Sequence, residues 1–291
     1  MQRDRDSPGV PPGASADALP VADVMATTAA AVSRPAGVAL VTGASSGIGA
    51  AFVRELNRRG YALILVARDR NRLEAMARTL ACSAEILRAD LTDADGLAAV
   101  ERRLADPARP VDLLVNNAGA GTYGRVTETE AESLAATVDL NVLAVVRLTR
   151  AALPGMLSRH HGGVINVSSV VSTSAAPGMA AYAATKAFVD SWTRSLGGEL
   201  DGTPVTVTCV RPGWTRSEFH DRAGQTVGDV PGTLWHDPDA VARIALDAHG
   251  AGRLFCVPRL PPAIEARVLA EKIGRRGLRE VERLASAVRR S

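Results

Sequence analysis

Short apolar runs alternate with longer amphipathic segments along most of this chain. The first run, Val38–Thr42, precedes a glycine-rich turn and a stretch in which Ile48, Phe52 and Leu56 share one helical face before Gly60. Similar runs occupy 62–67, 85–89, 111–115, 164–167, 205–210 and 254–257. Because these runs are apolar on both faces and the segments between them are long enough for helices, the pattern predicts an α/β fold. Its centre would be a doubly wound parallel sheet of about seven strands.

The two ends of the chain depart from this pattern. Residues 1–36 are rich in Pro, Gly, Ala and Ser and predict a flexible N-terminal extension, with a start at Met25 as the alternative. From Pro262 onward the sequence predicts one or two Arg-rich amphipathic helices, interrupted at Gly274 and Gly277. A helix docked on the core or forming a dimer is favoured over one lying on a membrane surface. We therefore expect a single domain over 37–258, with a C-terminal helical extension over 259–291.

Composition narrows the class of protein. The chain has 291 residues, 46% of them apolar, and a net charge of +3 from scattered basic residues, which argues against nucleic acid as a partner. No apolar run approaches the ~18 residues of a membrane span, so no integral membrane segment is expected. The three cysteines, Cys82, Cys209 and Cys256, lack C-x-x-C spacing and predict reduced thiols and a cytoplasmic protein. The five histidines show no ligand spacing, so no metal is expected.

The turn after the first strand predicts a dinucleotide site. Thr42–Gly49 reads T-G-A-S-S-G-I-G, a G-x-x-x-G-x-G spacing that differs from the commoner G-x-G-x-x-G. Glycines allow the backbone to approach a pyrophosphate, and the following helix N-terminus offers N–H donors. A purely structural turn is the alternative. Its place in a βαβ pattern favours a Rossmann-type binding site.

The end of the second strand bears on which cofactor is used. Arg68 follows the strand directly and is placed to hold a 2′-phosphate, whereas an acidic residue there would hold a ribose hydroxyl. Asp69 lies one step further, and we interpret it as a helix N-cap or turn residue. NADP(H) is therefore favoured over NAD(H), with a solvated surface role for Arg68 as the alternative.

Tyr182 and Lys186 form a candidate acid/base pair. They lie in Gly178–Arg194, which reads as a helix, and their i, i+4 spacing places them on one face. A free phenol has a pKa of about 10, and a nearby ammonium favours the phenolate and lowers that value. The chain has 34 basic residues but only two lysines, Lys186 and Lys272, so a lysine at this position suggests a specific need. The preceding strand ends at Ser168-Ser169, where ligands bind in open α/β sheets.

Together these motifs resemble the short-chain dehydrogenases/reductases over roughly residues 36 to 258. The resemblance rests on the Thr42–Gly49 turn, the Asn116-Asn117-Ala118-Gly119 run, Asn141, the Ser169, Tyr182 and Lys186 set, and Pro212-Gly213. It implies a catalytic tetrad of Asn141, Ser169, Tyr182 and Lys186. In that tetrad Tyr182 passes the proton, Ser169 polarises the carbonyl, Lys186 lowers the Tyr182 pKa and binds ribose, and the Asn141 backbone holds a water.

The resemblance also implies a set of cofactor contacts. Asp90 would contact the adenine amine, with a simple turn residue as the alternative, and Ser217 stands where relatives more often carry Thr. The full expected set is Gly43, Ser45, Ser46, Gly47, Ile48, Gly49, Arg68, Asp90, Leu91, Asn117, Ala118, Gly119, Tyr182, Lys186, Pro212, Gly213 and Ser217. A mobile lid over about 214–236 would cover the substrate, with a packed loop as the alternative. Its apolar pocket would be lined by Trp214, Phe219, Leu234 and Trp235, with Tyr123, Val170 and Met179.

The resulting hypothesis is an NADP(H)-dependent oxidoreductase that interconverts a carbonyl and an alcohol on a small or lipid-like substrate. A cofactor-sensing regulatory protein of the same fold, with little turnover, is the alternative, and a membrane-surface enzyme held by its C-terminal helices is a third. A homodimer or homotetramer is expected, since the family commonly forms both.

Overall fold

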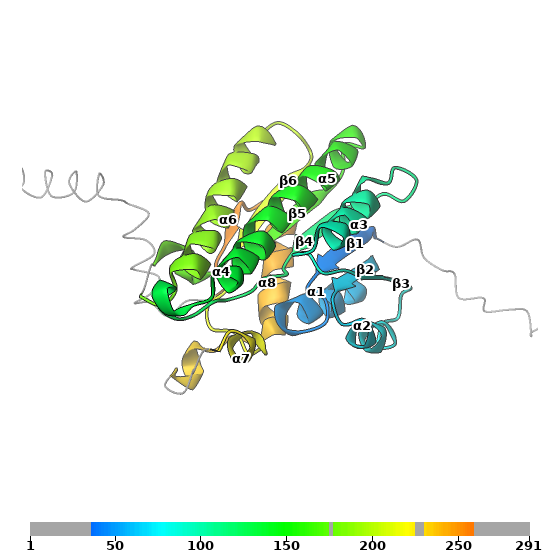
Figure 1. Ribbon diagram of the computed structural model, residues 1–291. Helices are drawn as coiled ribbons and strands as arrows, with labels where there is room; N and C mark the ends of the chain where they lie inside the picture. Colours follow the sequence, from blue (N-terminus) through cyan, green and yellow to red (C-terminus); the bar gives the residue numbers. More distant parts are fainter. Residues whose placement is uncertain (1–35, 175–176, 225–229, 259–291) are drawn as a thin grey trace, which may run out of the picture. The chain divides into compact units, whose positions relative to one another are not determined.

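A parallel sheet with helices on both faces forms the domain (Figure 1). The structure, a computed structural model, describes residues 36–174, 177–224 and 230–258. The expected extensions therefore lie outside the described residues, except for Ala36. The strands are β1 (Val38–Thr42), β2 (Ala62–Ala67), β3 (Ala84–Arg88), β4 (Leu113–Asn116), β5 (Gly163–Val167), β6 (Thr206–Val210) and β7 (Phe255–Cys256). Their order, β3-β2-β1-β4-β5-β6-β7, confirms the predicted seven-stranded, doubly wound sheet.

The helices supply the crossovers that a parallel sheet requires. The longer ones are α1 (Gly47–Arg58), α2 (Arg70–Ala77), α3 (Ala94–Ala105), α4 (Ala131–Val138), α5 (Ala144–Ser158), α6 (Ala180–Glu199) and α8 (Pro238–Gly250), and α7 (Phe219–Arg222) is a single turn. Helix α6 begins two residues later than predicted because Gly178 has φ +80°, outside the right-handed helical region. It also runs further, past Gly197, where the lack of a side chain lets the helix pack against Leu254.

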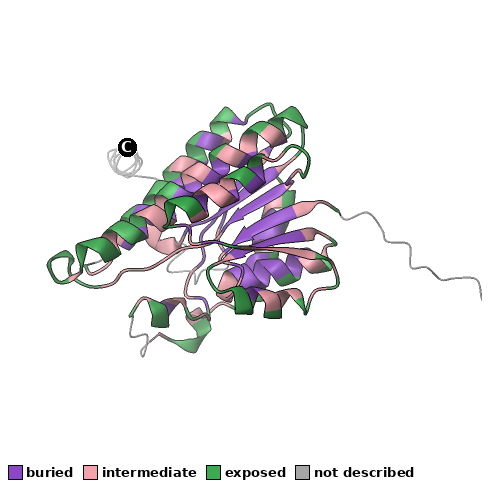
Figure 2. Cartoon of the chain, turned by 45° about the vertical axis from the view of Figure 1, so that its right-hand side comes forward, coloured by how far each residue is buried: buried purple, intermediate pink, exposed green. Residues whose placement is uncertain are grey.

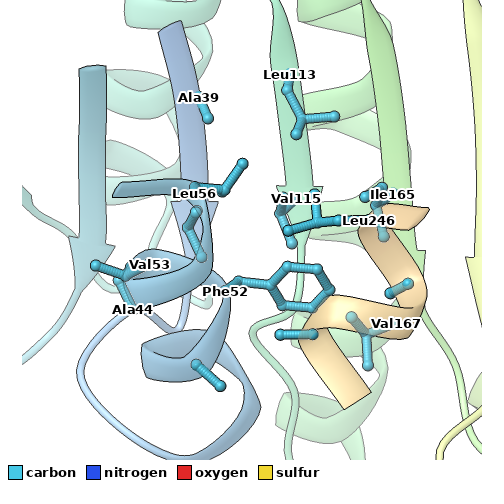
Figure 3. Packing of buried hydrophobic residues seen from close by; sticks show 14 of the residues in the cluster. Ala39, Ala44, Phe52, Val53, Leu56, Leu113, Val115, Ile165, Val167 and Leu246 are labelled. Atoms are coloured by element: carbon cyan, nitrogen blue, oxygen red, sulfur yellow. The ribbon is translucent and has the colours of Figure 1, made fainter. Parts of the chain in front are cut away.

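The sheet separates two apolar cores, one on each face. On one face Phe52 of α1 and Leu246 of α8 pack against Val115 and Ile165 of the central strands (Figure 3). The core on the other face includes Val100 of α3, Leu148 of α5 and Leu196 of α6. The central strands are mostly buried, the edge strand β3 is only partly buried, and the outer helical faces are exposed (Figure 2). This burial on both faces explains why the strand sequences are apolar rather than alternating.

One helical stretch, Ala131–Ser158, is apolar enough to resemble a membrane span. Its 28 residues have a mean hydropathy of 1.3 over the most apolar window, although its sequence contains no long uninterrupted apolar run. Within the described domain it packs along α3 and α6 as part of one helical layer. Core helices of globular proteins commonly combine these properties, so the stretch is weak support for a membrane span.

Candidate active site

The carboxyl ends of the strands open onto a cavity of about 710 Å³. This is the edge at which open α/β sheets bind ligands. Every residue that the sequence assigned to the cofactor or to catalysis lines this cavity, except Gly49 and Asn141. Those two lie one layer behind its wall, and each has a packing role that the sequence did not reveal.

The glycine turn brings backbone close to the cavity. Gly43 and Gly47 have positive φ values of +66° and +54°, which other residues rarely adopt. A Cβ on Gly49 would lie 2.1 Å from the Gly43 carbonyl oxygen, so Gly49 lets α1 pack tightly against the turn. Ser46 precedes α1 in an extended conformation without capping the helix through its side chain. The first N–H groups of α1 therefore remain available for a phosphate, and the turn fits a dinucleotide.

Thr42 ties the glycine turn to the segment after β4. Its hydroxyl oxygen accepts hydrogen bonds from the backbone N–H groups of Asn117 and Ala118, each at 2.9 Å. The Asn117 amide in turn donates to the Thr42 carbonyl oxygen at 2.9 Å. Asn117 thus stabilises the strand ends while lining the cavity, as the sequence indicated. The part played by the Thr42 hydroxyl was not foreseen.

Three arginines gather at the end of the cavity next to β2 and β3. Arg68 follows β2 with a 73% exposed side chain, and its Nη1 lies 3.9 Å from Asp90 Oδ2. The Asp69 carboxylate accepts from the Arg72 backbone N–H at 3.1 Å, which confirms that Asp69 is the N-cap of α2. Arg72 and Arg222 line the same end of the cavity, and no sequence motif had indicated either.

Glu218 holds two of these arginines together. Its carboxylate accepts from Arg72 Nη1 at 2.8 and 3.0 Å and from Arg222, which lies on α7. Arg222 also donates to Ser46 Oγ at 3.3 Å, so the network joins α2, α7 and the glycine turn. These hydrogen bonds from the two guanidinium groups, with their charge, lower the pKa of Glu218.

Asp90 combines the two roles that the sequence left open. It lines the cavity, and its carboxylate also accepts from the Thr92 backbone N–H at 2.9 Å and from the Thr92 hydroxyl at 2.7 Å. Burial opposes ionisation, but these hydrogen bonds and the charge of Arg68 outweigh it and lower the Asp90 pKa. Asp90 is therefore an ionised turn residue that faces the cavity.

Asn141 braces the site from behind. Helix α4 continues through a π-helical turn, Asp139–Leu143, into α5, and Asn141 lies buried in that turn. Its Oδ1 accepts from the Ala120 N–H at 2.9 Å, and its Nδ2 donates to the Ala120 carbonyl at 2.8 Å and to Thr185 Oγ1 at 3.0 Å. The side chain thus links the segment after β4 to α6. A π-helical turn is common at functional sites.

Tyr182, Lys186 and Ser169 meet at the centre of the cavity. Tyr182 and Lys186 are 6% and 4% exposed on one face of α6, and the Lys186 Nζ lies 5.8 Å from the Tyr182 ring centroid. The Lys186 ammonium donates to the Val167 carbonyl oxygen at 2.9 Å. Ser169 caps a 3₁₀ turn, Val170–Thr173, and its hydroxyl forms a hydrogen bond with that of Tyr182. The geometry gives one phenol, one hydroxyl and one ammonium around a common point.

The ionisation of Tyr182 differs from the sequence-based expectation. Burial raises its pKa well above 10, the neighbouring Tyr123 adds to this, and the hydrogen bond with Ser169 acts in the opposite direction. Burial also lowers the pKa of Lys186 to about 8, despite the nearby Cys209 and Asp190. Lys186 does not bring the phenol towards its working pH here, because desolvation dominates both groups. The protein groups alone hold Tyr182 as a protonated donor near neutral pH.

The rest of the cavity wall is apolar and aromatic. Of the residues predicted for the pocket, five line the cavity: Tyr123, Val170, Met179, Trp214 and Phe219. Leu234 and Trp235 do not line it, because Trp235 packs behind Trp214, with their ring centroids 5.8 Å apart. Residues 225–229 of the expected lid lie outside the described residues. The remainder includes α7, a 3₁₀ turn at Gly232–Leu234 and a bridge between Thr215 and His236.

No group of three or more potential metal-ligating side chains occurs within the described part of the chain. The cysteines Cys82, Cys209 and Cys256 are free thiols, as expected from their spacing. The cavity brings the Tyr182 phenol and the Ser169 hydroxyl together with a glycine turn whose backbone approaches the same space.

Comparisons with known proteins agree with this geometry. The family model for short chain dehydrogenases matches residues 37–228. The chain is 32% identical to a 3-oxoacyl-acyl-carrier-protein reductase from Escherichia coli over 219 residues, which cover 72% of this chain and 90% of that protein. Among solved structures, a short-chain dehydrogenase from Sphingobium yanoikuyae in complex with NADPH matches with a TM-score of 0.76 and 38% identity, over 84% of this chain and 95% of that one. A bulky-bulky ketone specific alcohol dehydrogenase from Comamonas testosteroni matches with a TM-score of 0.73 and 32% identity, over 85% and 95% of the two chains.

Proposed function

Since this chain belongs to the short-chain dehydrogenase/reductase family and is thus an NAD(P)-dependent oxidoreductase, we propose that it interconverts a ketone or aldehyde and its alcohol with NADP(H). The observation that carries the proposal is the convergence of Ser169, Tyr182 and Lys186 on the cavity that also receives the glycine turn. One cavity thereby holds phosphate-binding backbone and a buried proton donor.

The catalytic roles follow from the contacts around Tyr182. NADPH, if bound in this cavity, would supply the hydride that the carbonyl carbon accepts. Tyr182 would give its hydroxyl proton to the carbonyl oxygen, so that an alcohol forms. Ser169 is within hydrogen-bond reach of Tyr182 and orients the same oxygen. The Lys186 ammonium offsets the negative charge left on the phenolate after the proton has moved. Asn141 fixes the two segments between which these groups lie.

NADP(H) rather than NAD(H) is the cofactor in this proposal. Arg68, Arg72 and Arg222 concentrate positive charge where the adenosine ribose belongs, which favours a 2′-phosphate. Asp69 has its carboxylate engaged in capping α2, so it is not free to serve mainly as a partner of the ribose hydroxyls. The solved relative in complex with NADPH supports the same choice.

A screen of NADPH oxidation against ketones and aldehydes tests the proposal. Turnover is expected with NADPH, with a lower kcat/KM for NADH. Tyr182→Phe is expected to lose at least about 1,000-fold in kcat, because the variant keeps the ring but has no proton to donate. NADPH binding, followed by fluorescence, should stay within about twofold of wild type, because the phenol contributes little charge to the phosphate site. Undiminished turnover in this variant would contradict the assigned mechanism.

A cofactor-sensing protein of the same fold is the second candidate function. It would bind NADPH with similar affinity but reduce no carbonyl in the screen. The retention of Ser169, Tyr182, Lys186 and Asn141 in one connected site favours the enzyme. The partner in this proposal is therefore a small carbonyl or alcohol, with neither nucleic acid nor membrane required.

We further propose a homodimer or homotetramer located in the cytoplasm. Exposed Val138 and Leu143, on adjoining turns of the α4–α5 stretch, supply apolar surface for an interface. The free thiols agree with a reducing compartment. Light scattering coupled to gel filtration measures the assembly, and a monomer at micromolar concentration would exclude it.

A further inference from the structure

Aromatic residues are scarce in this chain and concentrated at one place. The sequence has four Phe, three Trp and three Tyr among 291 residues. Tyr123, Tyr182, Trp214 and Phe219 line the cavity, and Trp235 packs directly behind Trp214. Half of all aromatic side chains thus gather around a single site, although the two cores are built almost entirely from aliphatic residues. This distribution points to a role of the rings in the site rather than in folding.

Two of these rings close over the catalytic phenol. The Tyr123 and Phe219 centroids lie 5.9 and 5.5 Å from that of Tyr182, with tilted ring planes. Both rings also converge on Gly121, where a Cβ would lie 2.8 Å from Tyr123 and 2.9 Å from Phe219. Both rings flank Tyr182, which itself lines the cavity, so a carbonyl that reaches the Tyr182 hydroxyl comes to lie next to them. A substrate with a ring beside its carbonyl can therefore pack against these side chains.

Charge is distributed unevenly along the same cavity. Arg68, Asp69, Arg72 and Asp90 lie at the β2–β3 end, and Arg222 is drawn towards the glycine turn by Ser46. Around Tyr182 the described lining residues include only one charged side chain, that of Lys186, which is bonded to Val167. A carboxylate or phosphate on the substrate would have Lys186, already bonded to Val167, as its one ammonium or guanidinium partner among these residues, and a poorly compensated buried charge is costly.

From these observations we propose that the substrate is a neutral aryl ketone or aryl aldehyde, and that Tyr123 and Phe219 select its ring. The inference rests on the proposed function, because it names the substrate class of the same reaction. A flat ring next to the carbonyl can form tilted ring contacts with Tyr123 and Phe219, like those that both already form with Tyr182. It also has few rotatable bonds, so it loses less entropy on binding than a linear alkyl chain of similar apolar area.

Three methyl ketones, the first two of matched size, test this preference in the full-length protein with NADPH. They are acetophenone, cyclohexyl methyl ketone, in which the ring is saturated, and 4-acetylbenzoate, which adds a carboxylate. We expect kcat/KM for acetophenone to exceed that for the cyclohexyl ketone about fivefold, a typical contribution of aromatic pairing. We expect kcat/KM for 4-acetylbenzoate to be about 100-fold lower than for acetophenone, because its charge would be buried with little compensation.

Variants assign the preference to the two rings. Phe219→Leu and Tyr123→Leu each remove one ring while keeping apolar volume, and each should bring the ratio of acetophenone to cyclohexyl ketone close to one. Phe188→Leu is the matched control, because Phe188 stacks on Trp192 away from the cavity, and the ratio should stay at its wild-type value. NADPH binding and near-UV circular dichroism establish that each variant is folded. The two test variants lie in different segments, so misfolding of one leaves the other informative.

The possible outcomes separate the two hypotheses. A wild-type ratio at or below one, or a ratio unchanged in both leucine variants, would overturn the aryl preference while Tyr182-dependent reduction of other ketones upheld the proposed function. If no carbonyl is reduced, the proposed function fails. The aryl preference is then decided by ligand-observed NMR on the NADPH complex, where stronger binding of acetophenone than of the cyclohexyl ketone supports it and equal or weaker binding overturns it.

Discussion

Lys186 Nζ donates a hydrogen bond to the carbonyl oxygen of Val167 at 2.9 Å, which ties the ammonium on α6 to the last residue of β5. A carbonyl at a strand end would otherwise face the cavity without this partner. The contact fixes where the positive charge stands relative to Tyr182, and the narrow space around it explains why the chain keeps a lysine among so many arginines.

Lys186→Arg should therefore be strongly impaired even though it preserves the charge. The guanidinium is larger and planar, and its five N–H donors cannot all be satisfied where Lys186 is 4% exposed. We expect kcat to fall at least about 100-fold, as for loss of a catalytic proton-transfer group. Steady-state kinetics with the best ketone of the screen provide the measurement. Near wild-type kcat in this variant would show that position of the charge matters little.

Thr185 should act as a positioning residue through Asn141. Its hydroxyl accepts from Asn141 Nδ2 at 3.0 Å and donates to the Tyr182 carbonyl at 2.8 Å. Thr185→Val keeps the shape but leaves the buried amide without one partner, which should cost about 1–3 kcal/mol in free energy of unfolding. For Thr185→Val we also expect the fold-decrease in kcat to exceed the fold-change in KM. Thr185→Ser restores the hydroxyl and should recover both properties; failure of that rescue would point to packing instead.

In the wild-type protein the Glu218 carboxylate should compete with the 2′-phosphate of NADPH for Arg72 and Arg222, and so weaken NADPH binding. Its carboxylate occupies Arg72 and Arg222, the groups we assign to the phosphate. Glu218→Gln should therefore tighten NADPH binding about threefold, a modest effect because exposed ion pairs are weak, and leave NADH binding unchanged. Arg72→Gln should weaken NADPH binding selectively. Titrations at low and high salt measure both effects, which should shrink as salt screens the charges. Equal changes for NADH and NADPH would argue against a phosphate contact.

His249 should make the domain sensitive to mild acid. Its ring is hydrogen-bonded to Thr208 at 3.0 Å, and burial lowers its pKa from 6.5 to about 4. Between these two values the unfolded chain binds the proton and the folded chain does not, so stability falls as pH drops from about 6.5 to 4. The contribution to the free energy of unfolding is on the order of 3 kcal/mol. Urea unfolding across this range should show a shallower slope for His249→Gln, and identical slopes would exclude His249 as the source.

The sequence alone predicted the sheet and the main site motifs, because the patterns that indicate them are local. Strand runs, the glycine spacing and the i, i+4 placement of Tyr182 and Lys186 each depend on residues close together in the chain. They predicted a doubly wound parallel sheet of about seven strands, the glycine turn and the Tyr182–Lys186 pair, whereas most of the other cavity residues were expected from the family resemblance. The N-cap role of Asp69 was predictable for the same reason.

Other features depend on contacts between distant segments and left no local signal. The side-chain bonds of Asn141 to Ala120 and Thr185, and the approach of Arg222 to Ser46, exist only after folding. The sequence predicts that Trp235 lines the pocket, but in the folded chain Trp235 packs against Trp214, which lines the cavity in its place. The spacing of Tyr182 and Lys186 places an ammonium on the same helical face, but it does not reveal the depth of burial, which raises the Tyr182 pKa.

The π-helical turn at Asp139–Leu143 changes the helical phase between α4 and α5, which otherwise form one continuous helix. One additional residue in a helix turns everything beyond it by about 100°. Helix α4 packs on α6, whereas α5 packs on α3. The change of phase lets each part of the continuous helix turn its packing face towards its own neighbour. Deleting a single residue there would rotate either Asn141 away from Ala120 and Thr185 or the packing face of α5 away from α3. The position of Asn141 and the packing of α5 on α3 therefore both depend on the extra residue in this turn.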